Sequence, residues 1–152
     1  MKQFKIYTCG KMSGLTYEEQ IAWRKELQNC VEQKYEEIHG THANITFINP
    51  PNFFNYEDNL HKSEREVRDW EIGQVCDSDI LVVNLDGISD SIGSHFELGA
   101  VIGANISSGR NIKVIAIGEA QQNLHPWIQL SWLRHEHSIK NAADYIVNYL
   151  LI

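Results

Sequence analysis

The stretch 79–104 constrains the fold more than any other part of this chain. It opens with the apolar run Asp-Ile-Leu-Val-Val-Asn-Leu-Asp at 79–86, continues as a polar loop flanked by Gly87 and Gly93, and ends in a segment expected to be helical. An apolar run of this kind is typical of a strand buried on both faces of a parallel sheet. Ligands of open α/β sheets bind beyond the carboxyl ends of such strands, so this loop marks the expected functional site.

Strand-like and helix-like segments alternate along the sequence. Strands are expected at 4–9, 45–48, 79–85 and 112–117, with a short one around Leu133. Apolar residues at helical spacing occur between them, at 16–38, 63–77, 94–104 and 139–151. The alternation predicts one α/β domain over residues 1–152, a flavodoxin-like or Rossmann-like sandwich of about five parallel strands with helices on both faces.

Composition narrows the function classes. The chain has 152 residues, 43% of them hydrophobic, so it can bury a core without a metal or a disulfide. Its net charge of -7 argues against a nucleic-acid-binding surface, which needs clustered cations. Three cysteines without CxxC spacing, no signal-peptide pattern and no apolar run of about 18 residues predict a cytoplasmic protein that does not bind or span a membrane.

Common cofactor and nucleophile motifs are absent from the sequence. Neither the nucleotide triphosphate loop GxxxxGK[ST] nor the dinucleotide fingerprint GxGxxG occurs, and the GxSxG nucleophile elbow is also missing. His135 and His137 are two residues apart on a segment expected at the surface, where histidines are usually solvated. We therefore expect neither a cofactor nor a bound metal.

Glu97 has two interpretations from spacing alone. Ser94 followed three residues later by Glu97 fits a capping box, in which the glutamate only satisfies free amides of its own helix. Alternatively, Glu97 lies one turn into a helix that follows the polar loop of Asp86, Asp90 and Ser91, where a carboxylate can point at a bound ligand. The sequence favours the two interpretations about equally.

A second carboxylate stands out on the preceding helix. Val67, Glu71 and Val75 lie at i, i+4 and i+8, so Glu71 falls within the apolar stripe, whereas Asp69 falls on the opposite face. A carboxylate in a buried stripe is costly unless it is paired or faces a cavity. Glu71 is therefore either a site residue or a structural group bonded to backbone.

Together Glu97 and Glu71, near Tyr7 at the end of the first strand, predict glycosidic-bond chemistry. Two carboxylates around one reacting carbon can divide the work between them, one attacking the sugar and the other handling the proton of the leaving group.

Three segments also carry a resemblance to a known family. They are Ile-Tyr-Thr-Cys-Gly-Lys-Met-Ser-Gly at 6–14, Ser-Asp-Ile-Leu-Val-Val-Asn-Leu at 78–85 and Gly-Ser-His-Phe-Glu-Leu-Gly at 93–99. In these segments the chain resembles the nucleoside 2-deoxyribosyltransferase family, to which the 2'-deoxynucleoside 5'-phosphate N-hydrolases are related. The similarity runs in order from the first strand to the last helix.

The resemblance implies roles for particular residues. It implies that Glu97 is a nucleophile forming a covalent deoxyribosyl-enzyme and that Tyr7 holds its carboxylate. It also implies an acid eight residues before Asp79, which is Glu71 where the family usually has aspartate; Asp69 fits only with a shifted helix. The candidate substrate-binding residues are Asp69 and two loop groups, namely Gly10, Lys11, Met12 and Ser13 in the first loop and Asp86, Asp90, Ser91, Gly93 and Ser94 in the second.

Substrate and reaction stay open between alternatives. Family members that act on free nucleosides often carry aspartate at the position of Ser91, whereas the phosphate-specific N-hydrolases have serine there, which suits a phosphate because a carboxylate repels it. Ser13 and Lys11 are further phosphate candidates. We expect a 2-deoxyribosyl transferase first, a deoxynucleoside monophosphate hydrolase second, and a non-catalytic nucleotide-binding protein third.

The expected partners are small molecules and further copies of the chain. The small molecules are a deoxynucleoside or deoxynucleotide and a free nucleobase. The resemblance also implies a homo-oligomer in which the segment Pro126–Ser138 of one subunit closes the site of another.

Overall fold

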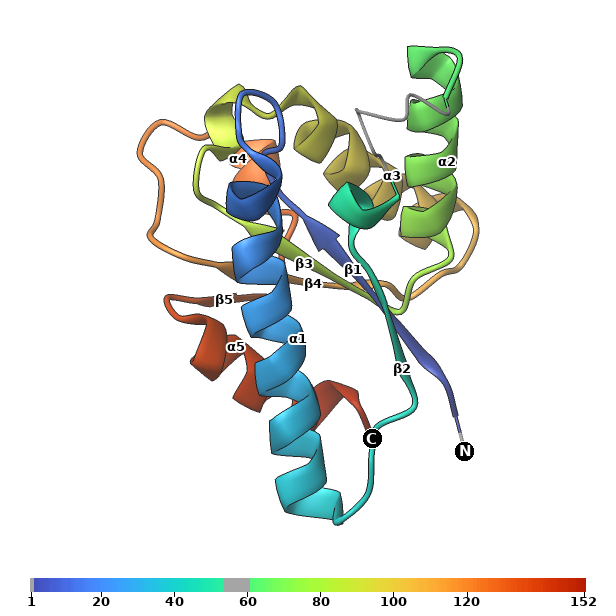
Figure 1. Ribbon diagram of the computed structural model, residues 1–152. Coiled ribbons are helices and arrows are strands. Elements are labelled where there is room, and N and C mark those ends of the chain that lie inside the picture. The colour runs from blue at the N-terminus through green and yellow to red at the C-terminus, as the bar shows by residue number, and fades with distance from the viewer. Residues whose placement is uncertain (1, 54–60) are drawn as a thin grey trace.

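The computed structural model describes residues 2–53 and 61–152 and contains one parallel five-stranded sheet (Figure 1). Its strands lie in the order β2-β1-β3-β4-β5, the order typical of flavodoxin-like folds. Their bounds are β1 Phe4–Cys9, β2 Ile45–Ile48, β3 Ile80–Asn84, β4 Lys113–Ile117 and β5 Arg134–Glu136. The expected α/β sandwich is confirmed, and the short fifth strand begins one residue after Leu133.

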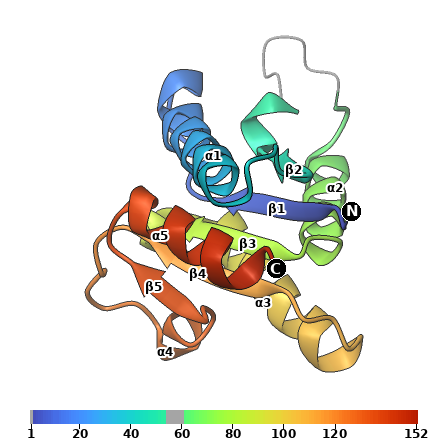
Figure 2. The ribbon, with the colours of Figure 1, turned by 90° about the horizontal axis from the view of Figure 1, so that it is seen from below.

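Two helices cover each face of the sheet. The helices are α1 Tyr17–His39, α2 Glu64–Cys76, α3 Ile92–Ser107, α4 Pro126–Gln129 and α5 Ile139–Tyr145, and α5 continues as one π-helical turn, Ile146–Leu150. Figures 1 and 2 show α1 and α5 on one face and α2 and α3 on the other. The apolar spacing predicts one regular helix over 139–151, whereas in the structure the α-helix ends at Tyr145 and a π-helical turn follows it.

Alternate residues of the central strands build two separate cores. Ile6, Ile80 and Val82 pack with Leu27 of α1 and Ile146. The intervening strand residues, among them Tyr7, Leu81 and Val83, pack with Val75 of α2 and Leu98 of α3. Because side chains alternate across a strand, residue 7 faces the α2/α3 side and residue 8 faces the α1 side.

Local signals explain where α1 begins and ends. Thr16 forms a complete capping box with Glu19, in which each side chain accepts a hydrogen bond from the other residue's backbone amide. Gly40 ends the helix in a left-handed conformation at φ 66°, which costs glycine little.

The glycines of α3 do not lie between this helix and the sheet. A Cβ atom added at Gly99 or Gly103 would meet no other atom within 4 Å, whereas Ala100 and Ala104 pack against the core. The small residues facing the sheet are therefore the alanines, and the glycines lie on the outer side of the helix.

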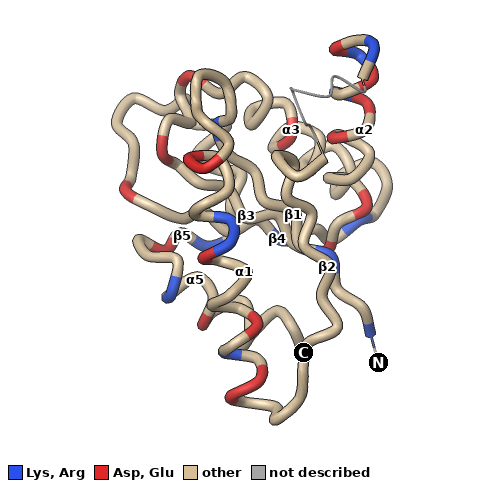
Figure 3. Tube along the Cα trace, in the orientation of Figure 1, with Lys and Arg blue, Asp and Glu red and all other residues tan. Residues whose placement is uncertain are grey.

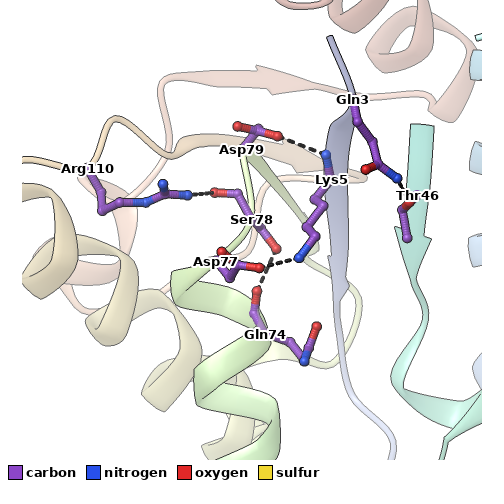
Figure 4. Close-up of polar contacts among 8 residues, drawn as sticks. All are labelled: Gln3, Lys5, Thr46, Gln74, Asp77, Ser78, Asp79 and Arg110. Carbon is purple, nitrogen blue, oxygen red and sulfur yellow. Dashed lines mark hydrogen bonds and ion pairs between the residues drawn. The ribbon is translucent and has the colours of Figure 1, made fainter. Parts of the chain in front are cut away.

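A cluster of polar contacts lies at the amino-terminal ends of β1 and β3 (Figure 4). The Asp79 carboxylate accepts a hydrogen bond from the Lys5 backbone amide at 2.9 Å, and the Lys5 ammonium pairs with Asp77. Arg110 donates to the Ser78 carbonyl at 3.0 Å, and the Ser78 hydroxyl donates to the Gln74 carbonyl at 2.7 Å. These contacts fix the turn between α2 and β3, at the opposite end of the strands from the predicted site.

The surface has no dominant cationic region among the described residues. Figure 3 shows Lys and Arg interspersed with Asp and Glu along the chain, in keeping with the net charge of -7. Within the part of the chain that the structure describes, every helix is too short or too polar to cross a membrane.

Candidate functional site

Glu97 and Tyr7 meet on the α2/α3 side of the sheet, toward the carboxyl end of β1. The Tyr7 hydroxyl donates a hydrogen bond of 2.9 Å to Oε1 of Glu97. Tyr7 is fully buried and the exposed fraction of Glu97 is only 6%. A buried carboxylate is thus held by a buried hydroxyl from another element, as the resemblance implied for these two residues.

The capping-box interpretation of Glu97 is wrong. α3 begins at Ile92, and Ser91 is its N-cap. Before it, Gly87 adopts a left-handed conformation and a short 3-10 helix, Ile88–Asp90, leads directly into α3. Ser94 therefore lies inside the helix, where its hydroxyl forms a 2.7 Å hydrogen bond with the hydroxyl of Ser91. Glu97 bonds across to β1 instead of back to its own helix amides.

Glu71 reaches the same cavity from α2. A cavity of about 360 Å³ is lined by residues of α2 and α3, namely Glu64, Arg65, Val67, Arg68, Glu71, Ile72, Gly93, Phe96 and Glu97. Asp69 is not among them, since it points outward and forms ion pairs with Arg65 at 3.5 Å and Arg68 at 2.9 Å. The structure thus brings Glu71, and not Asp69, together with Glu97.

The two cavity carboxylates perturb each other's titration. Burial, and next the negative charge of Glu71, raise the pKa of Glu97 to about 8, although Cys9, Tyr7 and Arg24 oppose this rise. Burial also raises the pKa of Glu71. Two interacting acids in one poorly solvated site titrate as a pair, so near neutral pH the pair retains one proton.

The groups that surround Glu97 on β1 are neutral hydrogen-bond donors. Burial and Glu97 raise the pKa of Tyr7 and of Cys9 well above their ordinary values, so both stay protonated. The Cys9 thiol is directed at the Ser94 carbonyl at 4.0 Å.

The first predicted loop lies against the second. A Cβ atom on Gly87 would come within 2.7 Å of Cδ of Lys11, so the lysine stem passes over the second loop, at a residue whose φ of +69° favours glycine. The Met12 carbonyl accepts a hydrogen bond from Gln20, whereas Ser13 is exposed. Gly10 packs against Trp23.

The residues of the second loop divide into buried and exposed groups. Ser91 and Ser94 are buried at the start of α3, and Gly93 lines the cavity. Asp86 and Asp90 are exposed. In the polar and aromatic segment 52–62, residues 54–60 lie outside the described part of the chain.

Sequence reasoning missed Arg24, which is fully buried on α1. Arg24, Leu27 and Val31 lie at i, i+3 and i+7 on the inward stripe of that helix, so the spacing that singled out Glu71 also singles out Arg24. Phe96, Arg65 and Arg68 were missed as cavity residues because nothing in the local sequence places α2 beside α3.

The two histidines considered for a metal have other contacts. Nε2 of His135 is 2.7 Å from the Gly118 carbonyl oxygen, and His137 lies 4.0 Å from the carboxylate of Glu119. Across residues 2–53 and 61–152 no three His, Cys, Asp or Glu side chains are grouped so as to hold a metal ion.

Comparison with known proteins supports the fold. No family model matches this chain. No curated protein matches it either. Among solved structures, it is similar to one described as a conserved protein from Enterococcus faecalis V583, with a TM-score of 0.71 and 16% sequence identity over 98% of this chain and all of the other. The likeness covers nearly the whole chain and shows that the two proteins share a fold.

Proposed function

We propose that this protein is an N-glycosidic bond enzyme that transfers 2-deoxyribose between nucleobases through a covalent glutamyl-sugar intermediate. The observation that carries the proposal is the buried Glu97 carboxylate, held by the Tyr7 hydroxyl in a cavity that Glu71 also lines. The family resemblance of the segments 6–14, 78–85 and 93–99 supplies the substrate class.

The shared proton of the carboxylate pair suits the first half of the reaction. Because the pKa of Glu97 is raised to about 8, the resting pair holds its proton mainly on Glu97. In the reactive form that proton lies on Glu71, and the Tyr7 hydroxyl stabilises the Glu97 anion. Glu97 attacks the anomeric carbon, the bond from that carbon to the base nitrogen breaks, and the departing nitrogen takes the proton of Glu71.

The second half reverses these roles. The Glu71 carboxylate accepts a proton from the incoming base, whose nitrogen attacks the anomeric carbon. The ester bond to Glu97 breaks and its carboxylate is regenerated. Neither half requires a cofactor, because the two carboxylates supply both the nucleophile and the proton.

A chromatographic assay with a deoxynucleoside and a different free base tests the proposal. We expect a new deoxynucleoside to form, and Glu97→Gln to lower kcat by at least about 1,000-fold because it removes the nucleophile. Glu26→Gln, at an exposed carboxylate of α1, is the matched control and should retain wild-type turnover.

Acid-quenched wild-type enzyme should carry a deoxyribosyl adduct that peptide mass spectrometry assigns to Glu97. A folded Glu97→Gln protein with near-normal turnover would contradict the proposal.

A second candidate function is hydrolysis of a 2'-deoxynucleoside 5'-monophosphate, with water in place of the incoming base. Two observations favour it. The neutral hydroxyls of Ser91 and Ser94 stand at the start of α3, and the Lys11 side chain crosses the same loop. Release of free base from the monophosphate alone, lost in Ser91→Asp because a carboxylate repels phosphate, would favour hydrolysis over transfer.

The same assay distinguishes catalysis from ligand binding alone. Tight binding of a deoxynucleotide, measured by calorimetry, without release of any base would favour a non-catalytic nucleotide-binding protein.

A further inference from the structure

Arg24 is a fully buried cation close to the end of β1. Its Nε donates to the Thr8 hydroxyl at 3.1 Å, one terminal nitrogen donates to the Gly10 carbonyl at 3.3 Å, and the other donates to the Gln20 carbonyl. The guanidinium also stacks over the Trp23 ring, 4.6 Å from its centroid. Burying a charge is costly unless its donors are satisfied, and these contacts occupy every nitrogen of the guanidinium.

No carboxylate in the described chain forms an ion pair with this guanidinium. The Arg24 hydrogen bonds end on neutral oxygens, and the negative charges that act on it belong to the site across β1. Burial lowers the pKa of Arg24 to about 10, and Cys9, Glu97, Tyr7 and Glu71, in that order, oppose the fall. Arg24 therefore remains positive at neutral pH.

Arg24 and Gln20 together hold the loop that follows β1. The Gln20 side-chain amide donates to the carbonyls of Met12 and Leu15, both at 3.0 Å, while Arg24 holds Gly10. A Cβ atom on Gly10 would lie 2.9 Å from the Trp23 ring, so the backbone approaches α1 more closely than a side chain permits. The loop 10–15 is thus tied to α1 at three carbonyls.

The same network continues to the end of β2. The Thr8 hydroxyl, which accepts from Arg24, donates to Oδ1 of Asn49 at 2.7 Å. The Asn49 amide in turn donates to Gln28 on α1 at 3.3 Å. A buried network with this many satisfied partners holds one geometry.

We propose that Arg24 is a positioning residue of the site, which fixes the end of β1 and the loop 10–15 from the α1 side and places a positive charge behind the strand that carries Tyr7 and Cys9. This inference rests on the proposed function of Glu97 as a nucleophile. Tyr7 and Cys9 from β1 and Glu71 from α2 lie beside Glu97, whereas Arg24 lies behind β1 on the α1 side; Tyr7 and Cys9 are neutral, Glu71 is an acid, and Arg24 is the cation.

Nuclear magnetic resonance of 13C-labelled glutamate carboxyls tests the electrostatic role directly. The Glu97 signal is assigned by its loss in Glu97→Gln. Removing the cation in Arg24→Met should raise the apparent pKa of Glu97 by about one pH unit. Arg24→Lys, which keeps the charge, should leave that pKa close to the wild-type value. Lys25→Met removes an exposed charge from the same helix and should shift nothing.

Steady-state kinetics give the second readout. The acid limb of the pH profile of kcat/KM should move up by the same amount in Arg24→Met and stay in place in Arg24→Lys. The lysine variant should still lose about tenfold in kcat, because an ammonium cannot reproduce the three-way bonding of the guanidinium to the Thr8 hydroxyl and two carbonyls. If the methionine variant does not fold, Arg24→Gln takes its place, since its amide retains a donor for one of these oxygens.

The same pKa of Glu97 in the wild type and in Arg24→Met would overturn the proposal. A lysine variant that shifts the titration as much as the uncharged variant would overturn it too. The resonance measurement needs no turnover, so it separates this inference from the proposed function. A wild-type protein without glycosidic activity would overturn the proposed function while the titration result still tested the electrostatic role of Arg24.

Discussion

At the scale of single residues, the buried acid pair acts against stability. Burial raises the pKa values of Glu97 and Glu71, and the charge of Glu71 raises that of Glu97 further, so the folded protein takes up protons that the unfolded chain releases. Such destabilising groups are typical of functional sites, where the chemistry needs a perturbed acid. The folded state tolerates the pair because Tyr7, Cys9 and Arg24 stabilise the anion in part.

This arrangement predicts a pH dependence of stability with a definite sign. An unfolded glutamate has a pKa of about 4.3, whereas that of Glu97 in the folded protein is about 8, so between these values the folded state binds more protons. The contribution of Glu97 is therefore fully favourable below about pH 4 and is lost as the pH rises through about 8.

Glu97→Gln should remove this loss. Its free energy of unfolding relative to the wild type should rise steadily between about pH 5 and about pH 8, as measured by urea denaturation at several pH values. The exposed Glu26→Gln should give a difference that does not change with pH. A constant difference for both variants would contradict a raised pKa at Glu97.

At the scale of elements, the turn from α2 to β3 positions the helix that carries Glu71. Its anchor is the Asp79 carboxylate, which satisfies the Lys5 backbone amide in β1 (Figure 4). Beside it, the ion pair between Lys5 and Asp77 is largely exposed to solvent.

The two aspartates should respond differently to removal. Asp79→Ala leaves the Lys5 amide without this acceptor and should lower the free energy of unfolding by about 1–3 kcal/mol. Asp77→Ala breaks only an exposed pair and should cost less than about 1 kcal/mol. Thermal and urea denaturation of both variants checks this, and equal losses would contradict the assignment of the anchor to Asp79.

At the scale of the whole molecule, α3 has an apolar outer side. Ile92, Phe96 and Ile106 are 72%, 60% and 80% exposed, and Gly99 and Gly103 leave open space between them. Apolar patches on a helix commonly mark an interface. We propose that a second copy of the chain covers this side; the family resemblance implies a homo-oligomer but does not name this surface.

The proposed assembly can be tested by light scattering. The wild type should have the mass of a dimer or a larger homo-oligomer, and Ile106→Glu, which places a charge on the outer side of α3, should reduce that mass. Ile38→Glu on α1, where the native side chain is 46% exposed, is the matched control and should leave the mass unchanged. A monomeric wild type would contradict the proposal.

Short-range regularities were sufficient to derive the fold. The apolar runs at 4–9 and 112–117 and the intervening helical spacing predict the strands and helices to within a few residues, because burial on one or two faces leaves a local period in the sequence. The helix starts expected at 16 and 63 coincide with the caps Thr16 and Ser63, whose hydrogen bonds join residues only three apart. The same periodicity put Glu71 and Asp69 on different faces of α2, as the structure has them.

Only the tertiary structure decided what Glu97 touches. The pattern Ser94 to Glu97 fits a capping box equally well, and the distinction depends on where α3 begins and on Tyr7, which is 90 residues away. The glycines of α3 likewise have a role that depends on which side of the helix faces the sheet. Arg24 was recognisable as a polar residue in an apolar stripe, but its partners Thr8 and Gly10 belong to β1 and the loop after it, which meet α1 only in the folded chain. Local sequence is enough to predict backbone conformation and burial. The raised pKa values of Glu97 and Glu71 depend instead on burial and on charges from elements that only the folded sheet brings together.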